Sequence, residues 1–587
     1  MKFRWVVYLV IALATLSVWG HTVRFEFTWD DRQFIEENTS IRSWAQLPAM
    51  LTRREGQSSL PEHFCLYRPV RTVAYALLNT AGGGPLPKPW FYHAANIAGH
   101  ALAAMLLCGA STQLLTKIGG NPPNTARIAG MLLGLAYAVH PAVSEVVCWA
   151  KSFDDILAVV FCLAALVQLL AWQEGNERRL WFAVAFFVLA EYSKESAITF
   201  PLVALAYFWF LLKLPLVRSV KLSSGFFLAA AVFVVHRHVV LGQTSQTAPI
   251  SGTYWQSLVD TIPCVFAYVR LALGIPPFTI VYAHLEHGRA LTSAPVLLGG
   301  LALAGGILGA IVALKSERWR LLGFGLWWAL AFFIPVSNVV PMMQFMAERF
   351  MYLPLVGVLL TAGVMLLQIQ RGRLVVIGAC TTLVMWAAVA WDRSWVWSDD
   401  LTLFVDTAMN NPRNHVIENN AADAILELPA VTNVIRAKTT PSPKEVQAAI
   451  SSLAKAHSAF PANGPIANAL GVAWVSAGDC DEAIKCFRIA VSALPANAMY
   501  ARNLGQAMID GGRLADAERV LRQLRQFHEN DVGFLRMFCA VLLTQKGFEE
   551  AQPLIFRLKG LDPGNAEYDQ WLAEAQSSKK NEAGGRP

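Results

Sequence analysis

The sequence predicts an all-α protein in two parts, a polytopic bundle of about 11 membrane-spanning helices and a C-terminal solenoid of helical repeats. Hydrophobic residues make up 55% of the 587 residues and charged residues only 15%, whereas soluble globular domains carry about 25% charge. The charges are sparse before Asp392 and dense after it, and the charged part has a sequence period of 34 residues. We therefore expect a membrane domain over residues 1–395 and a water-exposed domain after it.

Eleven apolar segments are candidate spans, because a membrane-spanning helix needs roughly 20 apolar residues. They are 5–23, 92–116, 127–146, 155–172, 180–193, 197–213, 222–240, 293–314, 321–338, 351–369 and 373–391. A twelfth apolar segment, 258–275, contains Asp260 and Arg270 and is broken by Pro263. It predicts a re-entrant or interfacial helix rather than a span.

Basic residues in the short loops predict the orientation of these spans. With the N-terminus in the cytoplasm, every inner loop carries Lys or Arg, as the positive-inside rule requires. These loops are Lys117–Arg127, Glu174–Arg179, Lys213–Lys221, Lys315–Arg320 and Arg371–Arg373. The first outer loop, 24–91, and the C-terminal domain then lie on the same outer side. The N-terminal segment lacks a small-residue cleavage site, which favours an uncleaved anchor over a signal peptide.

The period in the C-terminal part is typical of tetratricopeptide repeats, each a pair of antiparallel helices. FPAN at 460–463 returns as LPAN at 494–497, and the repeat also aligns Leu470 with Leu504 and Phe538, Gly478 with Gly512, and Ala483 with Ala517 and Ala551. We expect the repeats over 396–576, with a degenerate first unit at 414–460, and a disordered tail at 577–587. Such arrays bind peptides or partner proteins in a concave groove, and we favour that role over a spacer.

Two adjacent carboxylates, Asp30 and Asp31, follow the first apolar span directly. The predicted topology places them at the outer membrane surface, where a carboxylate can act as a general base on a substrate that arrives from water. The alternative is that they cap a short helix in the 24–91 loop.

The other ionisable residues of the membrane domain gather near the outer ends of the spans. They are Arg68, Arg71, Glu145, Lys151, Asp154, Asp155, Lys194, Glu195, Glu348 and Arg349. Charged residues within or beside spans are costly and usually functional, so their convergence on one face predicts a membrane-surface active site. The structural alternatives are an ion pair between the neighbours Lys194 and Glu195 and another between Glu348 and Arg349.

His93 and His100 lie seven residues apart, on one face of a predicted span, with Asn96 between them. For this polar seam we favour hydrogen bonding between helices over metal ligation. The nine cysteines show neither a paired pattern nor the spacing of a zinc site, so no metal site is predicted.

A series of short motifs resembles the transmembrane-and-tetratricopeptide-repeat O-mannosyltransferases and their bacterial relatives. In order they are WDD (29–31), YRPV (67–70), YHAANIAGHAL (92–102), HPAVSEVV (140–147), YSKESAITFP (192–201), PVSNVV (335–340), AERFMYLP (347–354) and RSWVWSDDLTLF (393–404). The resemblance covers essentially the whole chain, and its motifs are specific together although weak singly. It implies the GT-C fold of polytopic glycosyltransferases that use polyprenyl-phosphate sugars, with an acidic catalytic residue in the first outer loop.

The resemblance also implies a mechanism and its residues. A polyprenyl-monophosphate-linked sugar would enter from the bilayer, and Asp30 or Asp31 would deprotonate the hydroxyl of a Ser or Thr in a protein acceptor. The hydroxyl would then displace the lipid phosphate with inversion. Arg349 is the first candidate to bind the phosphate, since arginine makes bidentate contacts with phosphate, and Lys194 and Lys151 follow. The matching motifs hold the other site candidates Arg68, His93, His100, Glu145, Asp155, Glu195, Glu348 and Tyr352.

One departure from the family concerns the segment Lys151–Asp155. Relatives often carry a basic residue two or three positions before the acid that matches Asp155, where this chain has Phe153 or Asp154. Lys151 lies one helical turn away from Asp155 and is the cation that can take that place. Mannose, the sugar of the eukaryotic members, is therefore not assumed for this chain.

Other functions remain open at this level. A lipid-linked oligosaccharide ligase or polymerase would place key residues in a large late loop, whereas the largest loop here is the first. A non-catalytic membrane scaffold would recruit partners through its repeats and tolerate loss of both aspartates. No cofactor is implied beyond the lipid-phosphate sugar donor, dependence on a divalent metal is left open, and no nucleic-acid partner is expected. We expect a multi-pass protein in contact with membrane lipids, in a bacterial inner membrane with the repeats in the periplasm.

Overall fold

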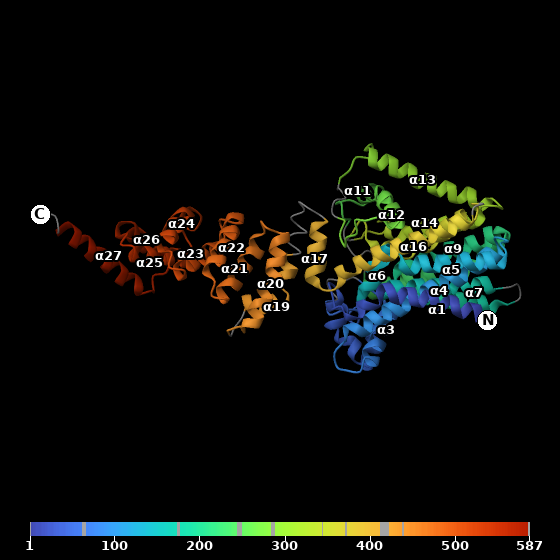
Figure 1. Ribbon diagram of the computed structural model, residues 1–587, viewed down its shortest axis with the longest axis horizontal. Helices are drawn as coiled ribbons and strands as arrows, with labels where there is room; N and C mark the ends of the chain where they lie inside the picture. The colour runs from blue at the N-terminus through green and yellow to red at the C-terminus, as the bar shows by residue number, and fades with distance from the viewer. Residues whose placement is uncertain are drawn as a thin grey trace. The chain divides into compact units, whose positions relative to one another are not determined.

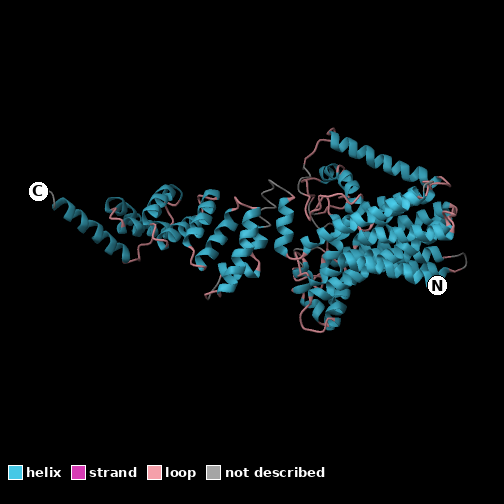
Figure 2. Ribbon diagram, in the orientation of Figure 1, coloured by secondary structure: helices cyan, strands magenta, loops and turns pink. Residues whose placement is uncertain are grey.

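The computed structural model describes residues 2–60, 66–172, 176–242, 249–282, 288–342, 344–369, 372–410, 422–436 and 440–584. These residues form helices joined by turns and loops, without a β-strand among them (Figure 2). The chain divides into two compact units, Met1–Asn411 and Pro412–Pro587. The division falls beyond the boundary predicted at residue 395.

Unit 1 is a bundle of long helices, most of them drawn from blue to yellow in Figure 1. Its α-helices are α1 (Lys2–Trp19), α2 (Leu47–Thr52), α3 (Pro69–Ala81), α4 (Pro89–Lys117), α5 (Pro123–Val139), α6 (Ser144–Cys148), α7 (Phe153–Ala171), α8 (Glu177–Ser193), α9 (Phe200–Ala206), α10 (Leu216–Leu241), α11 (Tyr254–Thr261), α12 (Cys264–Ala272), α13 (Ala294–Lys315), α14 (Arg320–Phe333), α15 (Pro354–Leu366), α16 (Gly372–Ser394) and α17 (Asp400–Met409).

Six helical stretches of the described residues are long and apolar enough to cross a membrane. They are Trp5–Arg24, Pro89–Lys117, Ala150–Ala171, Leu216–Leu241, Ala294–Lys315 and Gly372–Trp397. A seventh span is possible by length if α5 is joined to the helical segment Pro141–Cys148, which leaves α5 at an angle of 51°. The count of eleven spans is therefore not confirmed.

The remaining predicted spans correspond to shorter helices. Two of these helices end or begin close to the ionisable residues. The span predicted at 180–193 is α8, which ends just before Lys194, and the span at 351–369 contains α15, which begins after Arg349. Between these helices the chain forms short 3₁₀ turns, η7 (Glu195–Thr199) and η10 (Glu348–Met351). Irregular backbone at such a depth is tolerated where it is buried in protein or lines a polar site.

The segment 258–275 is broken into two helices, in agreement with the break at Pro263 that the sequence predicts. Helices α11 and α12 meet at Ile262 and Pro263. Proline has no N–H to give to the helix ladder, which explains the break.

Glycines let the long helices of unit 1 pack closely. A Cβ atom added at Gly130 of α5 would lie 2.2 Å from Thr112 Oγ1 of α4, and one added at Gly357 of α15 would lie 2.3 Å from the carbonyl oxygen of Gly325 in α14. Small residues at helix crossings let membrane helices approach to backbone contact. These crossings fix the helix ends that carry the site.

The first outer loop is a folded layer with its own apolar core. It contains η2 (Arg32–Glu36), η3 (Thr39–Arg42), η4 (Trp44–Gln46), α2 and α3. Phe34, Ile41, Met50 and Tyr75 are buried in this core together with Ala150, which precedes α7. The loop is thereby attached to the bundle at the start of α7.

Unit 2 is a row of helix pairs with the predicted period. Its helices are α19 (Pro429–Ile435), α20 (Pro443–Ala459), α21 (Gly464–Ser476), α22 (Cys480–Ala493), α23 (Ala498–Asp510), α24 (Leu514–Leu524), α25 (Val532–Thr544), α26 (Phe548–Leu561) and α27 (Glu567–Gly584). Ala483, Ala517 and Ala551 are fully buried, one in the second helix of each pair. The tetratricopeptide-like architecture is confirmed, whereas residues 411–421 and 437–439 of the degenerate first unit lie outside the described residues.

The repeat period also recurs in the capping residues of unit 2. Asn463, Asn497 and Asp531 precede the first helices of three successive pairs, and each side chain accepts a hydrogen bond from the backbone of its helix. Such caps satisfy amides that have no partner within the helix. Side-chain chemistry therefore sets the start of each unit.

Helix α27 runs from Glu567 to Gly584, and Tyr568, Trp571 and Ala575 near its start pack on the last repeat. The disordered tail predicted at 577–587 stays a prediction. The residues after 584 lie outside the described residues.

We predict that Gly471→Ala destabilises the first regular repeat by about 1–3 kcal/mol. An added Cβ would lie 2.5 Å from the Phe487 ring, so α21 and α22 must move apart. Hydrogen–deuterium exchange of the full chain in detergent should show faster exchange across both helices.

The matched control is Gly560→Ala in α26, where an added Cβ meets nothing within 4 Å. It should leave exchange unchanged or slow it slightly, because alanine favours helix over glycine. Equal protection in both variants would contradict the close packing of α21 on α22.

Candidate functional site

The turn Thr28–Asp31 carries the two aspartates, of which Asp30 is half-buried and Asp31 is buried. The Asp31 N–H donates to the Thr28 carbonyl at 3.0 Å, and the Thr28 N–H donates to Asp31 Oδ2 at 3.0 Å. Between them Trp29 has a φ of 54°, a left-handed conformation that costs a residue with a side chain roughly 1–2 kcal/mol. The turn is therefore held by specific contacts.

Asp31 uses both of its carboxylate oxygens in hydrogen bonds to backbone amides. It is fully buried, and its Oδ1 accepts a hydrogen bond from the Lys151 backbone N–H at 2.7 Å. Burial raises the pKa of the Asp31 carboxyl well above its usual range, while its two amide donors oppose the rise. Although η2 begins at the next residue, the Asp31 side chain makes no cap hydrogen bond to it, so the helix-cap interpretation is wrong.

Asp30 differs from its neighbour in exposure and in hydrogen bonding. Its side chain is half-buried, and no hydrogen bond reaches its carboxylate from the described residues. Burial raises the pKa of Asp30, and the positive charges of Lys151 and Arg349 partly offset that rise. A carboxylate with a raised pKa is a stronger base.

Lys151 supplies a cation without a counter-ion. Its ammonium lies over the Trp149 ring at 4.5 Å and the Phe34 ring at 5.5 Å, and it forms no ion pair within 4 Å in the described part of the chain. Its backbone is fixed on both sides, because the N–H bonds Asp31 and the carbonyl accepts from the Tyr75 hydroxyl at 2.6 Å. The site therefore holds a positioned ammonium that is stabilised mainly by ring faces.

Arg349 supplies the second cation and is held by Glu145. The Arg349 backbone N–H donates to Glu145 Oε2 at 2.8 Å, and its guanidinium donates to Glu145 Oε1. Gln344 Oε1 accepts from Nη2 at 3.0 Å. The guanidinium also lies 5.9 Å from the Trp29 ring, and its side chain remains 14% exposed.

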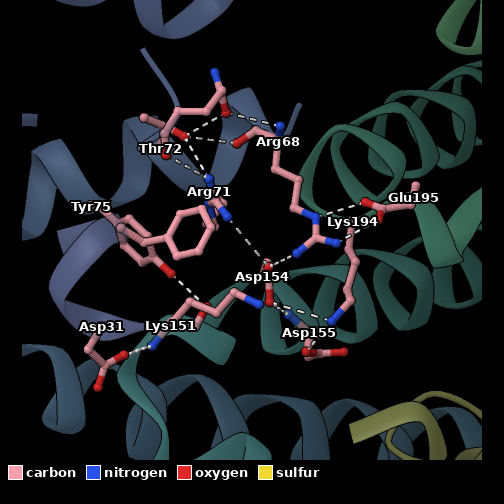
Figure 3. Close-up of polar contacts among 12 residues, drawn as sticks. Asp31, Arg68, Arg71, Thr72, Tyr75, Lys151, Asp154, Asp155, Lys194 and Glu195 are labelled. Carbon is pink, nitrogen blue, oxygen red and sulfur yellow. Dashed lines mark hydrogen bonds and ion pairs between the residues drawn. The ribbon is translucent and has the colours of Figure 1, made fainter. Parts of the chain in front are cut away.

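A second cluster of charges lies around Arg68 and Asp154 (Figure 3). Arg68 bonds Asp154 at 2.6 Å and holds Glu195 through two hydrogen bonds of 2.8 and 2.5 Å. Lys194 is paired with Asp155 and lies 3.7 Å from Asp154. These buried charges are matched within the cluster, and it joins the first outer loop to α7 and η7.

The neighbour pairs that the sequence suggested as structural do not form. Lys194 pairs with Asp155 and Glu195 with Arg68, because the extended backbone at Lys194 sends successive side chains to different sides. In the same way Arg349 pairs with Glu145, whereas Glu348 faces Arg393 at 3.5 Å.

His93 and His100 of α4 contact different segments of the chain. His93 Nε2 lies 3.3 Å from the carbonyl of Glu26, which lies in an irregular segment. His100 bonds the Tyr352 hydroxyl at 2.8 Å and the Ala138 carbonyl in α5 at 3.2 Å. In the described part of the chain no three His, Cys, Asp or Glu side chains gather as metal ligands. His100 thus links α4 to α5 and to Tyr352.

Glu348 contacts Arg393 and Tyr282 rather than the neighbouring Arg349. It is fully buried, and the Tyr282 hydroxyl donates to its Oε1 at 3.4 Å. Burial raises the pKa of Glu348 to about 8, and the positive charge of Arg393 opposes the rise. It is a packing carboxylate between η10 and α16 rather than a member of the Asp30 site.

The structure thus divides the predicted site residues into groups. Asp30, Lys151, Arg349 and Glu145 form one group, and Arg68, Asp155, Lys194 and Glu195 form the matched cluster beside it. Asp31 holds the turn, while His93, His100, Tyr352 and Glu348 lie in the framework. Sequence reasoning missed the central place of Asp154, the support from Gln344, and the stacking of Trp29 on Trp149 at 4.7 Å; the WDD motif was the one available signal for Trp29.

Comparisons with known proteins give distant structural likenesses only. No protein-family model matches the sequence, and no curated protein matches it. The archaeal oligosaccharyltransferase AglB from Archaeoglobus fulgidus, in complex with an inhibitory peptide and a dolichol-phosphate, is 12% identical with a TM-score of 0.39. The match covers 71% of this chain and 59% of AglB.

Other solved structures are similar to the repeat part. YrrB, a TPR protein with an unusual peptide-binding site, is 18% identical over 30% of this chain and 84% of its own, with a TM-score of 0.24. Pseudomonas aeruginosa pilF is 15% identical over 32% of this chain and 93% of its own, with a TM-score of 0.22. Likenesses at this level describe the fold and carry no argument about activity.

We predict that Arg68→Met destabilises unit 1 by about 3–5 kcal/mol, because it leaves buried Asp154 and its cluster without their central cation. A thermal melt of the full chain in detergent should show a clearly lower midpoint. The control is Arg53→Met in the same loop, whose side chain is exposed and should leave the midpoint unchanged. If Arg68→Met and Arg53→Met have the same melting midpoint, the cluster does not stabilise the outer loop.

Proposed function

We propose that this protein is a membrane glycosyltransferase of the GT-C type, which moves a sugar from a polyprenyl-monophosphate donor to a Ser or Thr hydroxyl of a protein. The observation that carries the proposal is the half-buried Asp30 carboxylate, which accepts no hydrogen bond from the described residues and lies within electrostatic reach of two cations, Lys151 and Arg349. One of those cations, Lys151, has no ion-pair partner there either. A free base beside unsatisfied positive charge suits a reaction that removes a proton and releases a phosphate.

Asp30 is the general base of the proposed reaction. It takes the proton of the acceptor hydroxyl as the oxygen attacks the anomeric carbon of the sugar. The new bond forms on the face opposite the lipid phosphate, so the configuration inverts as the bond to the phosphate breaks. General-base catalysis of this kind contributes roughly 10²–10⁴-fold.

Lys151 and Arg349 offset the charge of the departing phosphate. Lys151 is the stronger candidate because its ammonium is unpaired, whereas Glu145 already holds the Arg349 guanidinium. Lys194, which ranks ahead of Lys151 on sequence grounds, is neutralised by Asp155 and lies close to Asp154. Cations placed where negative charge develops lower the barrier most when they are preorganised.

The proposed partners follow from the two units. The six apolar helices are consistent with a lipid-linked donor that enters from the bilayer, and the tetratricopeptide-like repeats suit recruitment of a protein or peptide acceptor. We place the site and the repeats on the periplasmic side of a bacterial inner membrane, as the basic inner loops suggest.

The first test separates the two aspartates. Asp30→Asn should reduce transfer by about 10²–10⁴-fold without changing the melting midpoint, because no protein contact is lost. Asp31→Asn should lower stability by about 1–3 kcal/mol, since an amide NH₂ would face one of the two backbone donors. The measurements are intact masses of exported proteins from cells with each variant and thermal melts of the purified chains.

Glu36→Gln is the matched control for this test, because Glu36 is an exposed carboxylate of the same loop. It should leave both transfer and stability unchanged. Full transfer by Asp30→Asn would support a non-catalytic membrane scaffold instead of the proposed enzyme.

The second test uses the pH dependence of transfer. Asp30 must be ionised to act as a base, and its pKa is raised by burial. Activity should therefore fall as the pH drops through that raised pKa. Lys151→Met removes a cation that lowers the pKa of Asp30. The acid limb of the pH profile, where kcat/KM falls as the pH is lowered, should therefore move to higher pH in a reconstituted assay.

Arg53→Met serves again as the charge-matched control and should leave the acid limb in place. If the acid limb of Lys151→Met lies at the same pH as that of wild type, Asp30 and Lys151 do not share a site.

A further inference from the structure

Residues 398–400, at the start of α17, hold the turn that carries Asp30. The Glu26 N–H donates to the Ser398 carbonyl at 3.1 Å. Asp400 Oδ1 accepts from the Trp29 N–H at 2.7 Å, and its Oδ2 accepts from Arg32 Nη2 at 2.7 Å. Contacts from one short segment thus reach both sides of Asp30, across more than 360 positions of sequence.

The contacts of residues 398–400 act on Asp30 through Trp29. Its φ of 54° is a conformation that side-chain-bearing residues rarely adopt without support. Its N–H is bonded by Asp400, and its ring is stacked on Trp149 with an interplanar angle of 15°. Because Asp30 follows directly, the backbone at Trp29 sets the direction in which the Asp30 carboxylate leaves the turn.

Asp400 is well suited to hold a strained backbone. Its side chain is only 7% exposed, whereas Arg32 is 31% exposed. A buried carboxylate makes stronger hydrogen bonds than a neutral acceptor, and both of its oxygens are used on the 26–32 segment. The adjacent Asp399 makes different contacts. Its Oδ1 caps α17 through the Thr402 N–H at 2.8 Å, and its Oδ2 accepts from the Ser398 and Thr402 hydroxyls at 2.6 and 2.9 Å.

We propose that Asp400 is a positioning residue for the transfer reaction, acting on Asp30 through the backbone of Trp29. The inference rests on the proposed function, in which Asp30 is the base. It gives the start of α17, the last α-helix of unit 1 before the repeats in the chain, a direct part in the site. Misplacement of a reacting group by about 1 Å costs on the order of 10²-fold in rate.

The test compares three variants of the full chain in a reconstituted assay with a polyprenyl-monophosphate sugar and a Ser/Thr peptide. Asp400→Ala should lower kcat by about 10–100-fold with the donor KM unchanged, because Lys151 and Arg349 keep their own contacts. Asp400→Asn should recover most of the loss, since its amide oxygen still accepts from Trp29. Asp399→Asn, which keeps an N-cap, should behave as wild type.

Hydrogen–deuterium exchange supplies a readout that does not need the reaction. Asp400→Ala should speed exchange across 26–36 and leave α7 unchanged, and Asp399→Asn should change neither. If Asp400→Ala matches Asp399→Asn in exchange and in kcat while wild type is active, the inference is overturned and the proposed function stands. If wild type transfers no sugar although Asp400→Ala loosens 26–36, the proposed function is overturned, and a catalytic role for Asp400 falls with it.

A double-mutant cycle tests the route through Trp29. Glycine adopts a positive φ at no steric cost, so in a Trp29→Gly background the turn needs less support. Asp400→Ala should then cost less than about 3-fold in kcat, against about 10–100-fold in the wild-type background. Equal costs in both backgrounds would overturn the proposed route.

Discussion

The site depends on the bonding of one buried carboxylate, Asp31, to two backbone amides. It bonds the Thr28 N–H within its own turn and the Lys151 N–H at the start of the seventh helix. Each bond satisfies a buried donor that would otherwise cost free energy. Together they fix the first outer loop to the bundle and place Lys151 beside Asp30. We therefore assign the proposed general base to Asp30, because both carboxylate oxygens of Asp31 already accept hydrogen bonds.

Charge matching then selects the groups that remain for chemistry. Buried charges are costly unless they are paired, and the cluster of Arg68, Asp154, Asp155, Lys194 and Glu195 pairs them almost completely. Arg349 is likewise held by Glu145. In the described residues around the turn, neither Asp30 nor Lys151 has an ion-pair partner within 4 Å, and the charge of Lys151 lowers the pKa of Asp30. Lys151 is stabilised by the faces of Trp149 and Phe34, which hold an ammonium without neutralising it.

The sequence predicted the parts of the structure that depend on local pattern. The repeats were visible because packing and capping recur with one period, as at Asn463, Asn497 and Asp531. The gathering of ionisable residues on one face was visible from topology. The choice between Asp30 and Asp31 was not, because it depends on the left-handed backbone of Trp29 and on an amide 120 residues away. The order of the phosphate-binding candidates could not be predicted from the sequence either. A lysine can bind phosphate only if no carboxylate distant in the sequence already pairs with it, as Asp155 does with Lys194. The count of eleven spans is not confirmed for a related reason, because helices such as α8 and α15 end or begin at 3₁₀ turns and are shorter than a full span.

The most direct test of this account is a cryo-EM structure of the full chain with a bound polyprenyl monophosphate. We expect the phosphate within hydrogen-bond distance of Lys151 Nζ and beside Arg349, with the Asp30 carboxylate open toward the acceptor side and Asp31 still bonded to its two amides. A phosphate bound at Lys194 and Arg68, or an Asp31 released from the Lys151 amide, would contradict the account.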